Sequence, residues 1–147
     1  MSKGDLARVF FDADVLIAGS ASTSGASHLL LRLSEAGVIR GFTCAQALRE
    51  VERNLTSKLP LALPVFRALL TAAQVRVARE PAVDPAGGLL LTVHPDDAPI
   101  LMAAANCECH YLATFNLRHY RGHGLGVSVL RPGDILERIK YTLLNIA

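Results

Sequence analysis

The sequence has few aromatic residues and little net charge. Aromatic residues make up 5% of its 147 residues, with no tryptophan, so side chains on which unpaired nucleic-acid bases could stack are scarce. The formal net charge is +2, an excess too small to favour nucleic-acid binding by overall charge. Any contact with a polyanion must therefore depend on a local group of residues.

The sequence also lacks a disulfide framework and a long apolar run. Its three cysteines are odd in number and irregularly spaced, as expected where thiols stay reduced. No apolar segment reaches the roughly 18 residues that span a bilayer. Near the N-terminus, Asp12 and Asp14 interrupt the apolar segment that a secretion signal would need. We therefore expect a cytoplasmic protein with no membrane association.

Hydrophobic residues make up 51% of the chain and charged residues 19%, which predicts one folded domain over residues 1–147. Apolar patterns predict strands at 8–11, 38–43, 74–78, 111–115 and 127–130. They predict helices at 28–36, 45–55 and 61–73, a nearly all-apolar helix that opens at 95–97, and a last helix from 132. Strands that alternate with helices indicate an α/β fold, a three-layer α/β/α sandwich around a short parallel sheet.

Connections between these elements carry glycine, proline and small polar residues. We expect loops at 19–25, 80–88 and 116–126, and either an extended segment or a helical turn at 89–93. Histidines at 119 and 123 lie in the last of these loops, and we interpret them as loop residues without a role.

Acidic and polar side chains follow two of the predicted strands. Asp12 follows the strand 8–11 and Asn116 the strand 111–115, at the sheet edge where such folds bind ligands. Capping of a loop by Asp12 and a turn role for Asn116 are the alternatives. Asp14 adds a second acid to an apolar stretch, and burying both would be costly without a cation or hydrogen-bond donors.

Two further acidic pairs are ambiguous. Asp96 and Asp97 open a helix, where carboxylates often serve as caps. Glu50 and Glu52 flank the apolar stripe of their helix on opposite sides, so helical geometry does not choose between them. A solvated face shared with Arg49 and Arg53 would explain both glutamates.

Four segments together resemble the successive blocks of PIN-domain proteins, most closely the bacterial and archaeal toxin type. They are FFDADVLIAGSAS, ALREVERNL, HPDDAPILMAAANCECHYLATFNLRHY and VLRPGDILERI, and their order and spacing match over nearly the whole chain. The resemblance implies a catalytic, metal-binding site formed by Asp12, Glu50, Asp97 and Asn116, with Thr114 just ahead of the last.

Two positions depart from the usual pattern of that family. Asn116 stands where an Asp is usual, although an Asn in a T-F-N block also occurs, and this bears on the level of activity more than on the fold. Asp14 stands where a small polar residue or Asn is often found. The extra acid at position 14 would offset the charge missing at 116.

The resemblance implies a metal-dependent endoribonuclease that hydrolyses phosphodiester bonds in single-stranded RNA. Mg²⁺ and Mn²⁺ prefer such hard oxygen ligands and can activate a water for attack. Asp12 and Asp97 would be direct ligands, and Glu50 and Asn116 would act through water or bind a second ion. The candidate substrate-contacting residues are Thr114, Asp14, Arg49, Arg53 and Arg118, of which the arginines would hold phosphates.

The same resemblance implies a homodimer and a role as the toxin of a toxin–antitoxin pair, with an antitoxin protein that blocks the cleft. Two alternatives stay open at this point. In one, Asn116 weakens catalysis and the fold serves as an RNA- or protein-binding module. In the other, the strand-D-x-D opening belongs to a haloacid-dehalogenase-like phosphatase with Asp12 as nucleophile and Asp14 as acid and base.

Overall fold

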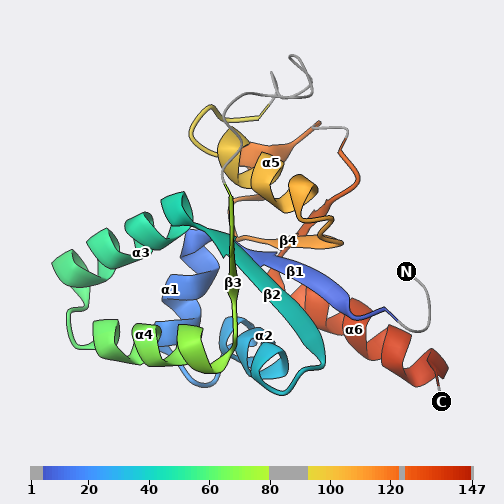
Figure 1. The fold of residues 1–147 in the computed structure, drawn as a ribbon, viewed down its shortest axis with the longest axis horizontal. Helices are drawn as coiled ribbons and strands as arrows, with labels where there is room; N and C mark the ends of the chain where they lie inside the picture. Colours follow the sequence, from blue (N-terminus) through green and yellow to red (C-terminus); the bar gives the residue numbers. More distant parts are fainter. Residues whose placement is uncertain (1–4, 80–92, 123–124, 147) are drawn as a thin grey trace.

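A parallel sheet of five strands forms the centre of the protein in a computed structural model, which describes residues 5–79, 93–122 and 125–146 (Figure 1). The strands are β1 (Ala7–Phe11), β2 (Ile39–Cys44), β3 (Arg76–Ala78), β4 (Tyr111–Ala113) and β5 (Ser128–Leu130). Their order is β3-β2-β1-β4-β5, with every pair parallel. The order reverses between β1 and β4, so this fold class places a ligand site beyond the carboxyl ends of those two strands.

Helices cover both faces of the sheet, as the three-layer prediction requires. They are α1 (Ala13–Ala21), α2 (Ala26–Glu35), α3 (Ala45–Lys58), α4 (Ala62–Ala72), α5 (Ala98–Asn106) and α6 (Pro132–Ile146), with a 3₁₀ helix, η1 (Leu117–Tyr120). Figure 1 shows α5 on one side of the sheet and α1, α2 and α4 on the other, while α6 packs against α2. The predicted α/β/α sandwich is therefore confirmed.

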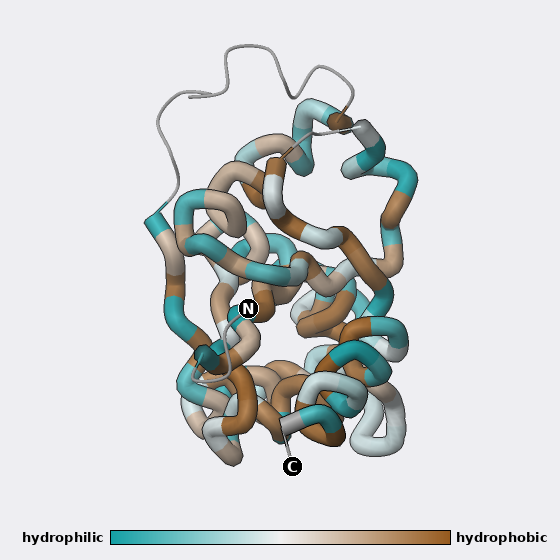
Figure 2. Tube along the Cα trace, turned by 90° about the vertical axis from the view of Figure 1, so that its right-hand side faces the viewer, coloured by the Kyte–Doolittle hydropathy of each residue, from teal (hydrophilic) through white to brown (hydrophobic). Residues whose placement is uncertain are grey.

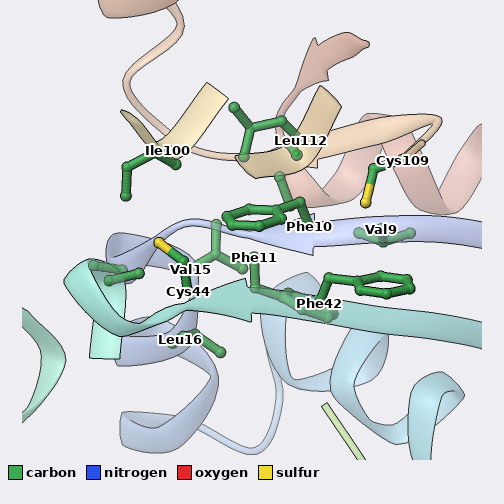
Figure 3. Close-up of a cluster of buried hydrophobic side chains, with 14 of the residues drawn as sticks. Val9, Phe10, Phe11, Val15, Leu16, Phe42, Cys44, Ile100, Cys109 and Leu112 are labelled. Atoms are coloured by element: carbon green, nitrogen blue, oxygen red, sulfur yellow. The ribbon is translucent and has the colours of Figure 1, made fainter. Parts of the chain in front are cut away.

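The apolar core explains why these segments form strands and helices. Val9, Phe10 and Phe11 of the central strand are fully buried, because a parallel strand covered on both faces can be apolar without alternation. Successive side chains leave a strand on opposite faces, and Phe10 lies beside Leu112 and Ile100 on the α5 side (Figure 3). The outer helices instead alternate between hydrophilic and hydrophobic residues along the chain (Figure 2), as amphipathic helices do.

Most predicted elements agree with the structure within a few residues, but the expected loop at 19–25 is wrong in its first part. The segment from Ala13 to Ala21 is helical, and Gly19 lies inside that helix. A Cβ at Gly19 would lie 2.7 Å from the Leu31 side chain, so this glycine permits close packing of α1 on α2 rather than a turn.

Three smaller differences concern connections. Strand β4 ends at Ala113 rather than at residue 115, and η1 occupies part of the expected loop 116–126. Strand β3 begins only at Arg76 because Gln74 has a φ of 53°. The predicted loop at 80–88 and most of 89–93 lie outside the described residues. None of the described helices combines the length and the hydrophobicity that crossing a membrane requires.

The tight packing of Gly41 in β2 gives a stability prediction. A Cβ there would lie 2.8 Å from Ser34 Oγ and 2.9 Å from a Phe11 ring carbon. We expect Gly41→Ala to lower the free energy of unfolding by about 1–3 kcal/mol, because overpacking forces these neighbours apart. Denaturant unfolding monitored by circular dichroism measures the change.

The matched control is Gly133→Ala in the first turn of α6, where an added Cβ meets nothing within 4 Å. Alanine is the better helix former, so this variant should unfold at the same denaturant concentration or a slightly higher one. An equal loss of unfolding free energy in Gly41→Ala and Gly133→Ala would contradict the packing argument.

Candidate active site

A cleft of about 400 Å³ opens at the carboxyl edge of the sheet, beside the ends of β1 and β4. Segments far apart in the chain contribute to it: the start of α1, α3 from Gln46 to Arg53, the residues before α5 and the segment that follows β4. Its lining residues are Asp12, Asp14, Gln46, Glu50, Arg53, His94, Asp96, Asp97, Asn116 and His119. Five of these ten are acidic, so the cleft gathers negative charge.

Asp12 is the most deeply buried acid of the cleft, with 5% of the residue exposed. It forms the N-cap of α1, and its Oδ1 accepts a hydrogen bond from the Ala13 backbone N–H at 2.8 Å. Its Oδ2 accepts from the hydroxyls of Thr114 at 2.9 Å and Tyr120 at 2.8 Å. Burial raises the pKa of Asp12 even though these donors favour its charged form.

Asp14 anchors the turn that follows β4. Its Oδ2 accepts from the backbone N–H of Phe115 at 2.9 Å and from Asn116 Nδ2 at 3.3 Å. Its Oδ1 is buried and has no hydrogen-bond partner among the described residues. Burial, with the neighbouring Asp12 charge, raises the pKa of Asp14 to about 6. Asp14 thus positions Asn116 through Oδ2, while Oδ1 is the buried oxygen for which the described residues supply no hydrogen bond.

Thr114 does not suit its predicted contact with substrate. The residue is fully buried, and its hydroxyl lies 2.9 Å from Asp12 Oδ2 and 3.3 Å from Asp14 Oδ2. Its oxygen also accepts from the Asn116 backbone N–H at 3.1 Å. Thr114 therefore links the two acids and is closed to a ligand in the cleft, which corrects the sequence-based prediction.

Asp97 precedes α5 but does not cap it, since its carboxylate makes no hydrogen bond to the helix N-terminus. Asp97 Oδ2 lies 2.6 Å from His119 Nδ1 instead. The side-chain capping alternative is therefore wrong for Asp97. His119, interpreted from the sequence as a loop residue without a role, lies in η1 and contacts this acid. His123 lies outside the described residues.

The structure separates the two glutamates that helical geometry left equivalent. Glu50 lines the cleft, and partial burial together with the charges of Asp12 and Asp97 raises its pKa. Glu52 points elsewhere and forms an ion pair with Arg67 of α4 at 3.2 Å. Glu50 is therefore the glutamate placed for chemistry with the other acids.

The predicted arginines divide in the same way. Arg53 lines the cleft one helical turn after Glu50. Arg49 and Arg118 are exposed and do not belong to the lining residues. Of the three predicted arginines, Arg53 is thus the one that lies in the cleft.

Sequence reasoning missed several residues that shape the cleft. Gln46 Nε2 donates to the Asp96 carbonyl at 2.6 Å and joins the start of α3 to the start of α5. Tyr120 holds Asp12 from 108 positions away. His94, two residues before Asp96 in the HPDD segment, stood beside candidate acids and offered a usable signal. Tyr120 offered none, because an aromatic residue in an apolar context predicts burial alone.

The donors fit a divalent cation that keeps part of its water shell. No group of three or more His, Cys, Asp or Glu among the described residues is arranged to enclose an ion by itself. Mg²⁺ is commonly held by one or two carboxylates with waters as the remaining ligands. The unpartnered Asp14 oxygen and the raised pKa values of Asp12, Asp14 and Glu50 indicate negative charge that a cation would offset.

The pKa of Asp14 yields a prediction about stability. Because that pKa is raised in the folded protein from 3.8 to about 6, the folded state binds the proton more tightly than the unfolded state does. The free energy of unfolding should therefore fall as pH rises from about 4 to 6. We expect Asp14→Asn, measured in EDTA at about pH 7.5, to raise the free energy of unfolding by about 1–2 kcal/mol.

At about pH 4 the Asp14→Asn variant and the wild type should unfold at nearly the same denaturant concentration, because Asp14 is then protonated in the folded protein. Glu137→Gln on the exposed side of α6 serves as control and should change nothing at either pH. A gain from Asp14→Asn that is the same at both pH values would refute the assignment of the effect to buried charge.

Comparison with known proteins agrees with this geometry. A family model described as "PIN domain" matches residues 8–118, which include Asp12, Glu50, Asp97 and Asn116. No curated protein matches the chain, and no solved structure does. PIN domains are generally nucleases, and the match covers far more than half of the chain, which leaves the phosphatase alternative without support. The chain belongs to the PIN-domain family.

Proposed function

We propose that the protein is a metal-dependent endoribonuclease that hydrolyses phosphodiester bonds in single-stranded RNA. The observation that carries the proposal is the convergence of Asp12, Glu50 and Asp97, from β1, α3 and the start of α5, on one cleft. Their charges act on one another, since those of Asp12 and Asp97 raise the pKa of Glu50. Such mutual repulsion is tolerable when a cation binds between the acids.

Asp12 and Asp97 are the proposed ligands of the cation, and their hydrogen bonds indicate which oxygen atoms could bind it. Asp12 Oδ2 accepts from two hydroxyls, while Oδ1 accepts from one backbone N–H and keeps a lone pair, so Asp12 would offer Oδ1 to Mg²⁺ or Mn²⁺. Asp97 would be the second ligand, with His119 on its Oδ2. When bound, the cation would supply a Lewis acid for the phosphate and lower the pKa of a water.

Glu50 and Asn116 would act on water and substrate. Glu50 is exposed to the cleft and its pKa is raised, which suits a group that accepts a proton from the attacking water. Asn116 Nδ2 donates to Asp14, so its side-chain carbonyl is the atom left to accept a hydrogen bond from water. Arg53 would hold a neighbouring phosphate, a contact that positions the strand without reading its sequence.

The homodimer and antitoxin partners also remain proposals. Exposed apolar side chains support them, since Leu61 at the start of α4 is 90% exposed and Tyr141 and Leu144 of α6 are 71% and 68% exposed. Surfaces of this kind favour protein contacts when they cluster. A toxin role would follow if an antitoxin occluded the cleft.

The two glutamates of α3 provide a direct test of the nuclease proposal. We expect Glu50→Gln to lower the rate of RNA cleavage by about 100-fold or more, as loss of a group that transfers a proton does. Glu52→Gln removes the same charge from the same helix but only breaks the exposed pair with Arg67, so it should cleave as the wild type does. Cleavage of a labelled single-stranded RNA with Mn²⁺ gives both rates.

Cleavage that continues in EDTA would contradict the metal dependence. Tight binding of RNA without turnover at any Mg²⁺ or Mn²⁺ concentration would favour the alternative in which Asn116 weakens catalysis and the fold serves as a binding module. Equal losses of cleavage rate in Glu50→Gln and Glu52→Gln would contradict the proposal that Glu50 accepts the proton.

Metal binding should also stabilise the fold. A ligand that binds only the folded protein raises its stability with concentration, so MnCl₂ should raise the melting temperature relative to EDTA. The rise should shrink in Asp97→Asn, which loses one of the proposed ligands, and stay unchanged in Glu52→Gln. Differential scanning fluorimetry measures it, and a rise that Asp97→Asn leaves intact would place the ion elsewhere.

A further inference from the structure

Two histidine rings stack beside the acids of the cleft. His94 precedes α5 and His119 belongs to η1, and their ring centroids lie 5.0 Å apart with 23° between the planes. Both residues line the cleft, yet their side chains are 48% and 43% exposed. The sequence has few aromatic residues, so a pair of half-exposed flat rings at this place requires an explanation.

Hydrogen bonds hold the two rings in place from both chain segments. The His94 backbone N–H donates to the His119 carbonyl at 2.9 Å. His119 Nδ1 lies 2.6 Å from Asp97 Oδ2, and His94 Nδ1 accepts from the Asp96 backbone N–H at 3.3 Å. The stack is therefore formed before any ligand arrives, and a ligand that uses it does not have to order these side chains.

The His94 ring keeps exposed surface although His119 stacks on it. His119 covers one face of this ring, while nearly half of the His94 side chain remains exposed. The engagement of Nδ1 with Asp96 N–H makes this nitrogen a poor candidate for a metal ligand. A flat ring that hydrogen bonds hold in place and that stays nearly half exposed suits stacking with a planar ligand.

An unpaired nucleobase is the ligand that fits both the ring and its surroundings. Single-stranded RNA exposes its bases to stacking on aromatic side chains, histidine included. The acids of the cleft, which would hold a cation against a phosphate, lie next to the stack, since Asp97 contacts His119 directly. One nucleotide could then place its phosphate at the acids and its base on the rings.

We infer that His94, backed by His119, is a stacking platform for a base of single-stranded RNA next to the phosphate that is cleaved. The inference rests on the proposed nuclease function and names a part of its substrate site. It also gives the cleft a preference for unpaired RNA, because a base inside a duplex has no free face to stack.

A short single-stranded RNA that carries one 2-aminopurine tests the platform, because stacking quenches the fluorescence of this base. The titration uses the Glu50→Gln background with Mg²⁺, so that the RNA stays intact. We expect His94→Ala to weaken binding between about 5-fold and 150-fold, the range for loss of one stacked base, and to abolish the quenching. His94→Phe should restore both, since it keeps a flat ring without a nitrogen.

Two further variants separate stacking from other roles. His94→Gln keeps a polar side chain but no ring, and should behave as His94→Ala does. His28→Ala is the matched control, because His28 lies on α2, outside the residues that line the cleft, with its Nδ1 2.8 Å from the Gly19 carbonyl. It should bind and quench as the background protein does, and melting temperatures report whether each variant is folded.

Opposite results overturn the platform. If His94→Gln binds the RNA and His94→Phe does not, a hydrogen-bonding group at position 94 matters and the flat ring does not. Wild-type quenching in His94→Ala would show that the base stacks elsewhere. If the otherwise wild-type enzyme cleaves RNA while His94→Ala changes neither binding nor quenching, the platform fails and the nuclease function stands. If the RNA is quenched on binding but the wild type does not cleave it, the platform stands and the nuclease function fails.

Discussion

The geometry of this protein depends on how it buries the carboxylate of Asp12. Removing a charged group from water is costly unless donors or a cation replace the lost solvation. The backbone N–H of Ala13 and the hydroxyls of Thr114 and Tyr120 supply the donors. The parallel pairing of β1 with β4, which sets Phe11 opposite Ala113, delivers Thr114 to this position. The hydrogen bond that Asp12 receives from Thr114 therefore depends on β4 lying next to β1 in the sheet.

Asp14 is a second acid of the cleft whose carboxylate accepts a hydrogen bond from a distant residue, Asn116. The amide of Asn116 donates to Asp14, which belongs to α1. In this part of the cleft the negative charge therefore lies on α1 and not on the turn after β4. The cleft keeps an acid there although position 116 carries none. One buried Asp14 oxygen has no hydrogen-bond partner in the described part of the chain, so negative charge remains here that a cation could offset.

The third acid shows how position and partner decide the role of a carboxylate. Asp97 stands where an aspartate commonly caps a helix, yet it contacts His119, which in turn stacks on His94. The residues before α5 and after β4 are therefore coupled through side chains of the cleft. This coupling connects the acids, for which we propose a cation, to the stacked rings, for which we propose a base.

The sequence by itself determined the α/β class, nearly all strands and helices, and the position of Asp12 at a strand end, because apolar runs, periodicity and chain breakers act over a few neighbouring residues. Only the tertiary structure decided that Gly19 packs inside a helix, that Arg67 draws Glu52 away from the cleft and leaves Glu50 there, and that Tyr120 and His119 hold Asp12 and Asp97. The partners in these last two contacts stand 108 and 22 positions apart. No local pattern of residue types encodes a contact over such separations, so it becomes visible only when the sheet brings the segments together.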